Sequence, residues 1–315
     1  MTDLPVDATD PDLVRGESAS RAWYRGEPFT GDVTESDANG ALLEYSTYAD
    51  GALDGLSSLW YPDGADRATR QYDHGVPVDT WNEWYANGQR KQREIYWDSG
   101  RLRRRWRWTE SGDVLEDTDR ERWDKGVDDD AILMDDPRLS SYPDGSRYFL
   151  DSEPFSGQVV ERADGAPDGV IVALNTYVDG FASGPSRRWY FTGSARGVGA
   201  VARNRAVGLW LEWFSDGSPA KQAVFGSDGR LLAQRVWEEP GGAISSPPAL
   251  VVDGLEQRYR SDNSLEAAGV VVASGPIGTW LHWDAQENVV CEECFDSEGQ
   301  RVSILRWDAA GNRVE

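Results

Sequence analysis

The chain of 315 residues is poor in the side chains on which most enzymes and metal sites depend. It contains two histidines and two cysteines, and almost all of its 32 basic residues are arginine. Histidine is the usual general base and metal ligand near neutral pH, and small secreted domains are commonly dense in disulfides. We therefore expect neither a histidine-based catalytic or metal site nor a disulfide-stabilised secreted fold, and we expect the protein in the cytoplasm.

Long apolar segments are also missing. No apolar run approaches the ~18 residues that a membrane-spanning helix needs. Residues 1–12 are acidic and contain no apolar stretch of the kind found in secretory signal peptides. Fingerprints of nucleotide-binding loops and of the serine nucleophile elbow are absent as well. The sequence therefore predicts a non-enzymatic protein that needs no cofactor and does not enter a membrane.

The charge is strongly one-sided, with 55 acidic residues against 32 basic ones and a formal net charge of −23. Binding to nucleic acid requires lysine and arginine to neutralise phosphates, and an anionic membrane surface attracts basic segments. Neither nucleic acid nor a membrane is expected as a partner of this chain. A basic protein surface is the natural electrostatic complement.

Tryptophan and glycine are abundant, with 15 and 33 residues respectively. Aromatic residues make up 11% of the chain, which argues against disorder because disordered chains are depleted in them. Glycine permits the positive φ angles that tight turns need. The combination is typical of a β-rich protein with many turns.

Comparison of the sequence with itself reveals three related stretches. Pro-Phe-Thr-Gly at 28–31 is echoed by Pro-Phe-Ser-Gly at 154–157, and a series of aromatic and glycine positions then repeats in one register. The first two stretches match at Trp60, Trp81, Trp84 and Trp108 against Trp189, Trp210, Trp213 and Trp237, and the third continues the last three of these with Trp280, Trp283 and Trp307. So many coincidences indicate internal duplication.

Within each stretch a smaller unit recurs, in which aromatic runs alternate with tight-turn signals. Trp-Tyr-Pro-Asp-Gly at 60–64 is followed by Trp-Tyr-Ala-Asn-Gly at 84–88. Asp-Gly and Asn-Gly between aromatic or β-branched runs are the strongest short-range signal for a β-hairpin, because a tight primed turn needs positive φ. An isolated hairpin is only marginally stable. We therefore predict an all-β protein in which tandem antiparallel β-hairpins shield one another from water.

These stretches define the expected domain organisation. We expect an acidic N-terminal segment over residues 1–23 and a first hairpin array over 24–112. A charged linker over 113–146 leads to a second array over 147–239, which is an internal duplicate of the first. A further linker over 240–254 leads to a third, shorter array over 255–315.

Three motifs carry a resemblance to a known family. They are Gly-Glu-Pro-Phe-Thr-Gly at 26–31, Gly-Leu-Trp-Leu-Glu-Trp-Phe-Ser-Asp-Gly at 208–217, and the recurrent Tyr-x-Asp-Gly turn, as at 48–51 and 177–180. With them the repeated unit resembles the MORN repeat and, more closely, the MORN-variant repeat of YwqK-type antitoxin proteins. The resemblance implies an extended, curved and open antiparallel sheet of MORN-like hairpins. It also implies a bacterial antitoxin or immunity protein that sequesters a cognate toxin.

Few residues invite a chemical interpretation. His74 lies in a Tyr-Asp-His-Gly turn, where an exposed turn residue is the favoured interpretation, and His282 lies between two tryptophans on a predicted strand. Cys291 and Cys294 form a lone Cys-x-x-Cys motif, whereas structural zinc needs four ligands. Ordinary thiols are favoured over a redox or disulfide pair and over a metal site.

The aspartates within residues 128–136 suggest a divalent cation as one interpretation. The segment lacks the spacing, the fixed glycine and the terminal glutamate of an EF-hand loop. A solvated, charged loop is therefore the favoured interpretation.

Tryptophans at equivalent positions of the three arrays are the candidate partner-binding residues, because tryptophan is enriched at binding hot spots. The candidates are Trp84, Trp213 and Trp283, although recurrence at fixed positions is first of all a packing pattern. The leading functional hypothesis is a non-enzymatic antitoxin or immunity protein that binds a cognate protein, such as a basic toxin. A MORN-type structural scaffold and a carbohydrate-binding repeat protein are the alternatives.

Overall fold

The computed structural model describes residues 4–16, 19–163, 168–238, 240 and 252–314. Within these residues the regular structure is almost entirely β-strand, arranged in open sheets whose neighbouring strands are mostly antiparallel. The predicted all-β class is therefore confirmed. Among the described residues, no helix has the length and apolar character needed to cross a membrane.

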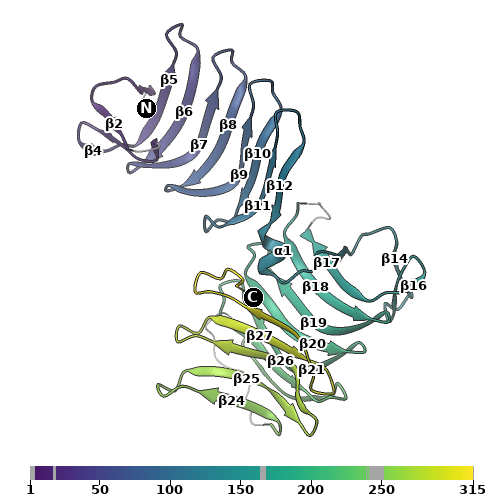
Figure 1. Ribbon diagram of the computed structural model, residues 1–315. Coiled ribbons are helices and arrows are strands. Elements are labelled where there is room, and N and C mark those ends of the chain that lie inside the picture. Colours follow the sequence, from purple (N-terminus) through teal and green to yellow (C-terminus); the bar gives the residue numbers. More distant parts are fainter. Residues whose placement is uncertain (1–3, 17–18, 164–167, 239, 241–251, 315) are drawn as a thin grey trace. The chain divides into compact units, whose positions relative to one another are not determined.

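The chain folds into two compact units, Met1–Glu121 and Arg122–Glu315, which we describe separately. The strands of the first unit are β1 (Val6–Asp7), β2 (Leu13–Arg15), β3 (Ala22–Tyr24), β4 (Glu27–Pro28), β5 (Gly31–Ser36), β6 (Leu42–Ala49), β7 (Ala52–Trp60), β8 (Asp66–Asp73), β9 (Val76–Trp84), β10 (Arg90–Tyr96), β11 (Leu102–Trp108) and β12 (Val114–Asp119). Strands β5 to β12 pair antiparallel in chain order and form a sheet that we call the first run (Figure 1). Strand β1 joins its edge in parallel with β5, and β2, β3 and β4 form a small separate sheet.

The turns explain why glycine and aspartate recur at fixed places. At one end of the first run, Asp50 and Gly51 join β6 to β7, and His74 and Gly75 join β8 to β9; all four residues have positive φ. This is the geometry of the type I′ turn, whose twist matches that of the strands it joins. At the other end, the amide of Gly64 donates a hydrogen bond to the carbonyl three residues earlier, at 2.8 Å. Residues that tolerate positive φ are therefore required at both ends of the sheet.

The second unit contains two runs of strands. A short helix, α1 (Arg120–Asp124), spans the boundary between the units. The strands that follow are β13 (Ile132–Leu133), β14 (Leu139–Ser141), β15 (Tyr148–Leu150), β16 (Glu153–Pro154), β17 (Gly157–Arg162), β18 (Ile171–Val178), β19 (Phe181–Trp189), β20 (Ala195–Ala202), β21 (Arg205–Trp213), β22 (Pro219–Phe225), β23 (Leu231–Val236), β24 (Leu255–Tyr259), β25 (Leu265–Val272), β26 (Gly275–Trp283), β27 (Val289–Phe295) and β28 (Arg301–Arg306). Strands β17 to β23 pair in chain order and form the second run, and β24 to β28 form the third run.

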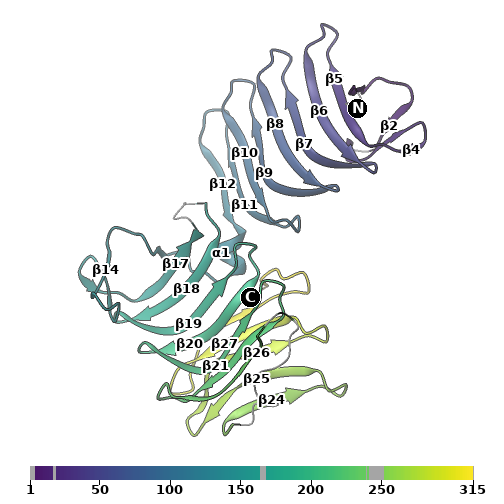
Figure 2. The same cartoon turned by 180° about the vertical axis from the view of Figure 1, so that it is seen from behind.

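The third run lies against one face of the second run (Figures 1 and 2). A single parallel bridge between Gly208 of β21 and Thr279 of β26 links the two. A Cβ atom on Gly208 would lie 2.8 Å from Cα of Gly278, so a glycine is needed for the backbones to approach this closely. The bridge thus fixes where the two runs cross.

The contact between the two runs is a hydrophobic core. Its fully buried members are Leu209, Val224, Ala268, Val270 and Ile277. Burial of a large aliphatic side chain contributes about 1.5–3 kcal/mol. The third run therefore supplies the second with a core that a single exposed sheet face does not have.

The segments expected as an acidic N-terminal segment (1–23) and a charged linker (113–146) contain strands. The first holds β1, β2 and β3, and the second holds β12, α1, β13 and β14. In both units a two-residue strand adds in parallel to the start of the run, as the pairs Val6–Val33 and Ile132–Val159 show. Strands this short carry too few residues for an alternating pattern to be recognised. The longer strands of these segments were not predicted because the segments are rich in charged residues, which are typical of loops.

A shared signal for these early strands is present in the sequence. Asp-Pro-Asp-Leu at 10–13 and Asp-Pro-Arg-Leu at 136–139 both precede a small three-stranded sheet. Leu13 and Leu139 pack into corresponding clusters around Phe29 and Phe155. The linker expected over 240–254 lies mostly outside the described residues.

Candidate functional site

The tryptophans expected to bind a partner mark the joints between successive hairpins. Trp84, Trp213 and Trp283 each end a strand and are half-buried. The hydroxyl of Tyr61 donates a hydrogen bond to the Trp84 carbonyl at 2.8 Å, and that of Tyr190 donates to the Trp213 carbonyl at 2.8 Å. Trp84 belongs to the first unit and the other two to the second, so the three do not form one cluster within a unit. Their main chains connect neighbouring hairpins, which is a packing role.

A second set of tryptophans is packed alike in all three runs. The indole N–H donates to a main-chain carbonyl ten residues earlier, at 2.9 Å for Trp81, 3.0 Å for Trp210 and 3.3 Å for Trp280. In the second run the ring of Trp210 covers Gly199, where a Cβ atom would lie 2.2 Å from the ring. The first run has Arg70 at that position, and its guanidinium lies 5.5 Å from the ring centroid of Trp81. The ring is common to the runs, but the residue beneath it differs.

One cross-strand row on the first run consists of polar and aromatic side chains. Successive pairings from β5 to β11 place its members opposite one another: Thr34, Tyr45, Ser58, Thr69, Asn82, Arg93 and Trp106. We call this row the polar face. The strongest contacts of strands β5 to β12 are those with their neighbours in the sheet. Among the described elements of the first unit, the small sheet β2 to β4 packs on the opposite face, around Val33, Tyr48 and Leu53.

The equivalent row on the second run is mostly apolar. Its members are Val160, Leu174, Arg187, Val198, Leu211, Gln222 and Arg235. The third run covers the part near Leu211, and Val127 packs on the start of the row. Arg187 forms a bidentate ion pair with Glu292 of the third run at 2.7–3.0 Å, and the two side chains are 6% and 4% exposed. Where the face is covered, aliphatic groups replace hydroxyls and amides, and the most deeply buried charge is paired.

The polar face ends in a stack of arginine and tryptophan. The guanidinium groups of Arg93 and Arg104 lie 5.3 Å and 4.2 Å from the ring centroid of Trp106. Arg104 also pairs with Asp117 at 3.4 Å and with Asp119 at 3.7 Å. Tryptophan and arginine are strongly enriched at binding hot spots, and cation–π contacts hold the ring in place. This stack is the part of the polar face best suited to anchor a partner.

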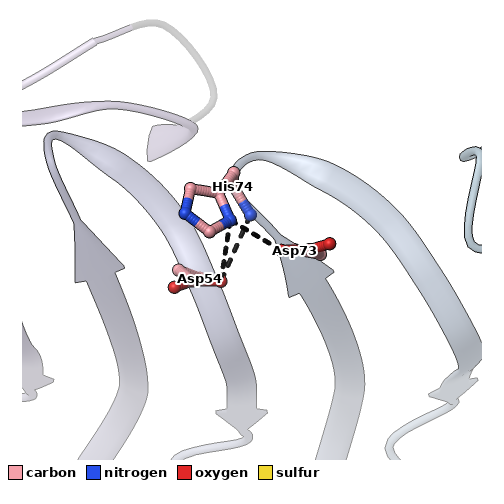
Figure 3. Close-up of side chains that lie close together, drawn as sticks. All are labelled: Asp54, Asp73 and His74. Atoms are coloured by element: carbon pink, nitrogen blue, oxygen red, sulfur yellow. Dashed lines mark hydrogen bonds and ion pairs between the residues drawn. The ribbon is translucent and has the colours of Figure 1, made fainter.

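Asp54, Asp73 and His74 form the one group of three potential metal ligands that converge within the described residues (Figure 3). His74 Nδ1 lies 2.6 Å from Asp73 Oδ1 and 3.9 Å from Asp54 Oδ1. The hydrogen bond with Asp73 and the negative charge of Asp54 raise the pKa of His74 above its usual 6.5. The imidazole is exposed. These contacts are electrostatically favourable without any ion.

Comparison with the second unit indicates that the contact between Asp54 and His74 belongs to the turn. The amide of His74 donates to Asp54 Oδ1 at 3.2 Å, and at the equivalent turn the amide of Arg203 donates to Ser183 Oγ at 3.0 Å. The two turns share this bond, although the second has neither an imidazole nor a carboxylate at these positions. Asp54 therefore secures a turn, and the cluster alone does not define a metal site.

The Cys-x-x-Cys motif lies on β27 and both of its thiols are free. Cys294 is buried between the second and third runs, and burial raises the pKa of its thiol to about 12. Cys291 is half-buried opposite His282, and burial and the charge of Glu293 raise its pKa as well. His282 Nε2 itself lies 3.2 Å from Glu293 Oε2. Reactive cysteines commonly have a lowered pKa, whereas both shifts here favour the protonated thiol over the thiolate.

The acidic stretch at 128–136 is divided between two environments. Side-chain and main-chain hydrogen bonds from Arg138 lower the pKa of Asp136 to about 2. Asp128 lies on the wall of a cavity, where burial and the charge of Asp130 raise its pKa. Within the described residues, these aspartates do not bring three ligand atoms together.

The cavity at Asp128 has a volume of about 520 Å³ and lies between the second and third runs. Thr176 and Arg187 of the second run, Ser303 of the third run, and Arg313 near the C-terminus are on its wall. Volumes of this size are common for small-molecule sites. Because the wall is assembled from segments far apart in the chain, local sequence patterns gave no indication of it.

No protein-family model matches the chain, and no curated protein matches it. The geometry itself therefore provides the functional candidates, which are the polar face and the cavity. Trp106 was not among the predicted site residues because it does not recur among the arrays. Trp106 is marked by the opposite signal, since Arg235 stands at the equivalent position of the second run.

Proposed function

We propose that this protein is a non-enzymatic binding protein of the antitoxin or immunity type, and that its polar face receives a cognate protein. One observation carries the proposal: the sheet face that the third run covers in the second unit has no such cover among the described elements of the first. The partly exposed hydroxyls of this face and the amide of Asn82 offer hydrogen bonds, and the stack around Trp106 offers an aromatic anchor.

The charge of the chain favours a basic partner. A net charge of −23 attracts a basic protein over a distance and orients it before contact. On the polar face, Asp117 and Asp119 offset the charge of Arg104, so this surface does not oppose such a partner. The motifs that resemble MORN-variant antitoxins make a toxin in the cytoplasm the natural candidate.

The proposal is tested with the product of the adjacent gene. We expect the two proteins to co-purify, the complex to weaken as salt rises, and co-expression to restore growth when the partner is toxic. Trp106→Ala should lower the affinity by about 2 kcal/mol, or roughly thirtyfold, because it removes the anchor. Isothermal titration calorimetry measures this loss.

Trp123→Ala is the matched control. Trp123 is 48% exposed and stacks on Arg313 at 4.3 Å, but it belongs to the second unit and is not a member of the polar face. We expect this variant to bind as the parent chain does. Equal losses in the two variants, or a complex that Trp106→Ala leaves intact, would contradict the assignment of the polar face.

A further inference from the structure

The cavity in the second unit combines a polar interior with apolar residues at its opening. Thr176 and Ser303 contribute hydroxyl groups to the wall, and Val178 and Val302, each 51% exposed, contribute apolar surface. The volume of about 520 Å³ exceeds what a few water molecules occupy and suits a small organic molecule.

Two hydroxyl groups on the wall lack a hydrogen-bond partner among the described protein atoms. They are Thr176 Oγ1 and Ser303 Oγ, and both atoms are buried. A buried hydroxyl without a partner costs about 1–3 kcal/mol, so folded proteins normally satisfy such groups. Both residues line the same cavity, so rotation of their side chains toward it would let one polar occupant satisfy both hydroxyls.

The first unit shows which protein partner the Thr176 hydroxyl lacks. At the equivalent position, Thr47 Oγ1 donates to Asp32 Oδ1 at 2.9 Å. The second unit has Gln158 in place of Asp32, and its carboxamide instead bonds to the main chain of residues 126 and 128 at 3.3 Å and 2.8 Å. The exchange fixes a loop at the cavity and leaves the Thr176 hydroxyl on the wall without its acceptor.

The fixed charges around the cavity balance one another. The charged residues of the wall are Asp128, Arg187, Arg203, Asp296 and Arg313, and the buried Glu292 is paired with Arg187. Three positive and three negative groups therefore surround the space. A charged occupant would lose its hydration and leave one sign in excess, which is costly in a partly buried site. The balance favours an uncharged occupant.

We propose that the cavity binds an uncharged, polyhydroxylated small molecule of monosaccharide size, and that Thr176 and Ser303 are its hydrogen-bonding residues. Sugar hydroxyls both donate and accept hydrogen bonds. They suit Ser and Thr side chains, because the hydroxyl hydrogen of these residues rotates and lets the group act as donor or acceptor. The C–H face of such a molecule suits Val178 and Val302. The cavity is built from residues of the second unit and the polar face from residues of the first, so failure of this proposal would leave the proposed protein-binding function untouched.

Calorimetric titration of the full chain with D-glucose, D-galactose, D-mannose and myo-inositol tests the proposal. We expect at least one of them to bind and to raise the Tm, and we expect D-glucosamine and D-gluconate to bind more weakly. Thr176→Val and Ser303→Ala should each lower the affinity about tenfold. Neither should lower the Tm of the free chain, because each removes a buried hydroxyl that has no protein partner.

Thr47→Val is the matched control, since it removes the equivalent hydroxyl from the first unit, where Asp32 accepts its bond. It should leave the affinity for the sugar unchanged. Failure of all four neutral probes to bind at millimolar concentration would overturn the proposal. Tighter binding of a charged probe, or equal effects of Thr176→Val and Thr47→Val on affinity, would overturn it as well.

Discussion

The first and second runs are two copies of one sheet that differ most on a single face. Thr69 in the first run corresponds to Val198 in the second, and Ser58 corresponds to Arg187. The pairing order, the turns and the tryptophan at positions 81 and 210 remain alike. The layer above a sheet therefore decides the chemistry of that face, while turns and ring contacts preserve the sheet itself.

The substitution expected to change the free energy of unfolding most is at the buried ion pair of Arg187, a position that Ser58 occupies in the first run. Glu292→Ala leaves the guanidinium of Arg187 buried without its partner, which should destabilise the second unit by about 3–5 kcal/mol. Urea denaturation followed by tryptophan fluorescence measures the loss. Replacing both residues, as in Arg187→Met with Glu292→Leu, should recover most of it. A double variant as unstable as the single one would show that the pair is not what secures this contact.

The next largest effect on the free energy of unfolding is expected in the core between the second and third runs, compared with the equivalent position of the first run. Leu209 is 1% exposed, and Leu209→Ala should cost about 2–5 kcal/mol. Thr80 occupies the equivalent position of the first run and is only half-buried. Thr80→Ala should change the free energy of unfolding by no more than about 0.5 kcal/mol. Similar losses in thermal or chemical denaturation would argue that both faces are covered alike.

Substitutions at the position under the tryptophan ring that both runs share should differ less in their effect on the free energy of unfolding. Gly199→Ala places a Cβ atom 2.2 Å from the ring of Trp210, and the resulting overpacking should cost about 1–3 kcal/mol. Arg70→Ala at the equivalent position of the first run removes an ion pair with Glu83 and a contact with Trp81, both half-exposed. Its cost should stay near or below about 1 kcal/mol. A harmless Gly199→Ala would mean that the ring is free to move.

The smallest effect concerns the turn at His74. Hydrogen bonding with Asp73 raises the pKa of His74 in the folded chain, so protonation favours the folded state. This contribution is fully present below the ordinary pKa of 6.5 and is lost as the pH rises through the raised value. An NMR titration of the imidazole should show the raised pKa, and Asp73→Asn should lower it. A pKa that Asp73→Asn leaves unchanged would rule out this cause.

The sequence allowed much of the sheet to be predicted, because its signals are local. Asp50 and Gly51 occupy a turn that needs positive φ, and Trp81 and Trp210 make the same hydrogen bond, as their spacing suggested. The short parallel strands, such as β1 and β13, were missed because two residues carry no recognisable period.

The site was largely beyond prediction, because it depends on contacts between distant segments. The cavity forms only because the third run lies on the second. The consequence of Gln158 in place of Asp32, a Thr176 hydroxyl without its acceptor, follows from the hydrogen bonds of each folded unit and not from the sequence. The tryptophans predicted from their recurrence, Trp84 and Trp213, accept hydrogen bonds from tyrosine hydroxyls at their main-chain carbonyls, where successive hairpins meet. Recurrence selects what all copies need, whereas a functional surface is marked by what one copy changes.

The cover on the second run, and the lack of one on the first, can be measured by cysteine labelling. Thr69→Cys and Val198→Cys introduce thiols at equivalent positions of the two runs, and peptide mass spectrometry separates them from Cys291 and Cys294. We expect iodoacetamide to label Thr69→Cys readily. We expect Val198→Cys, at a site that is 7% exposed, to react at least about a hundredfold more slowly, because labelling there requires local opening. Equal rates at the two positions would contradict the account.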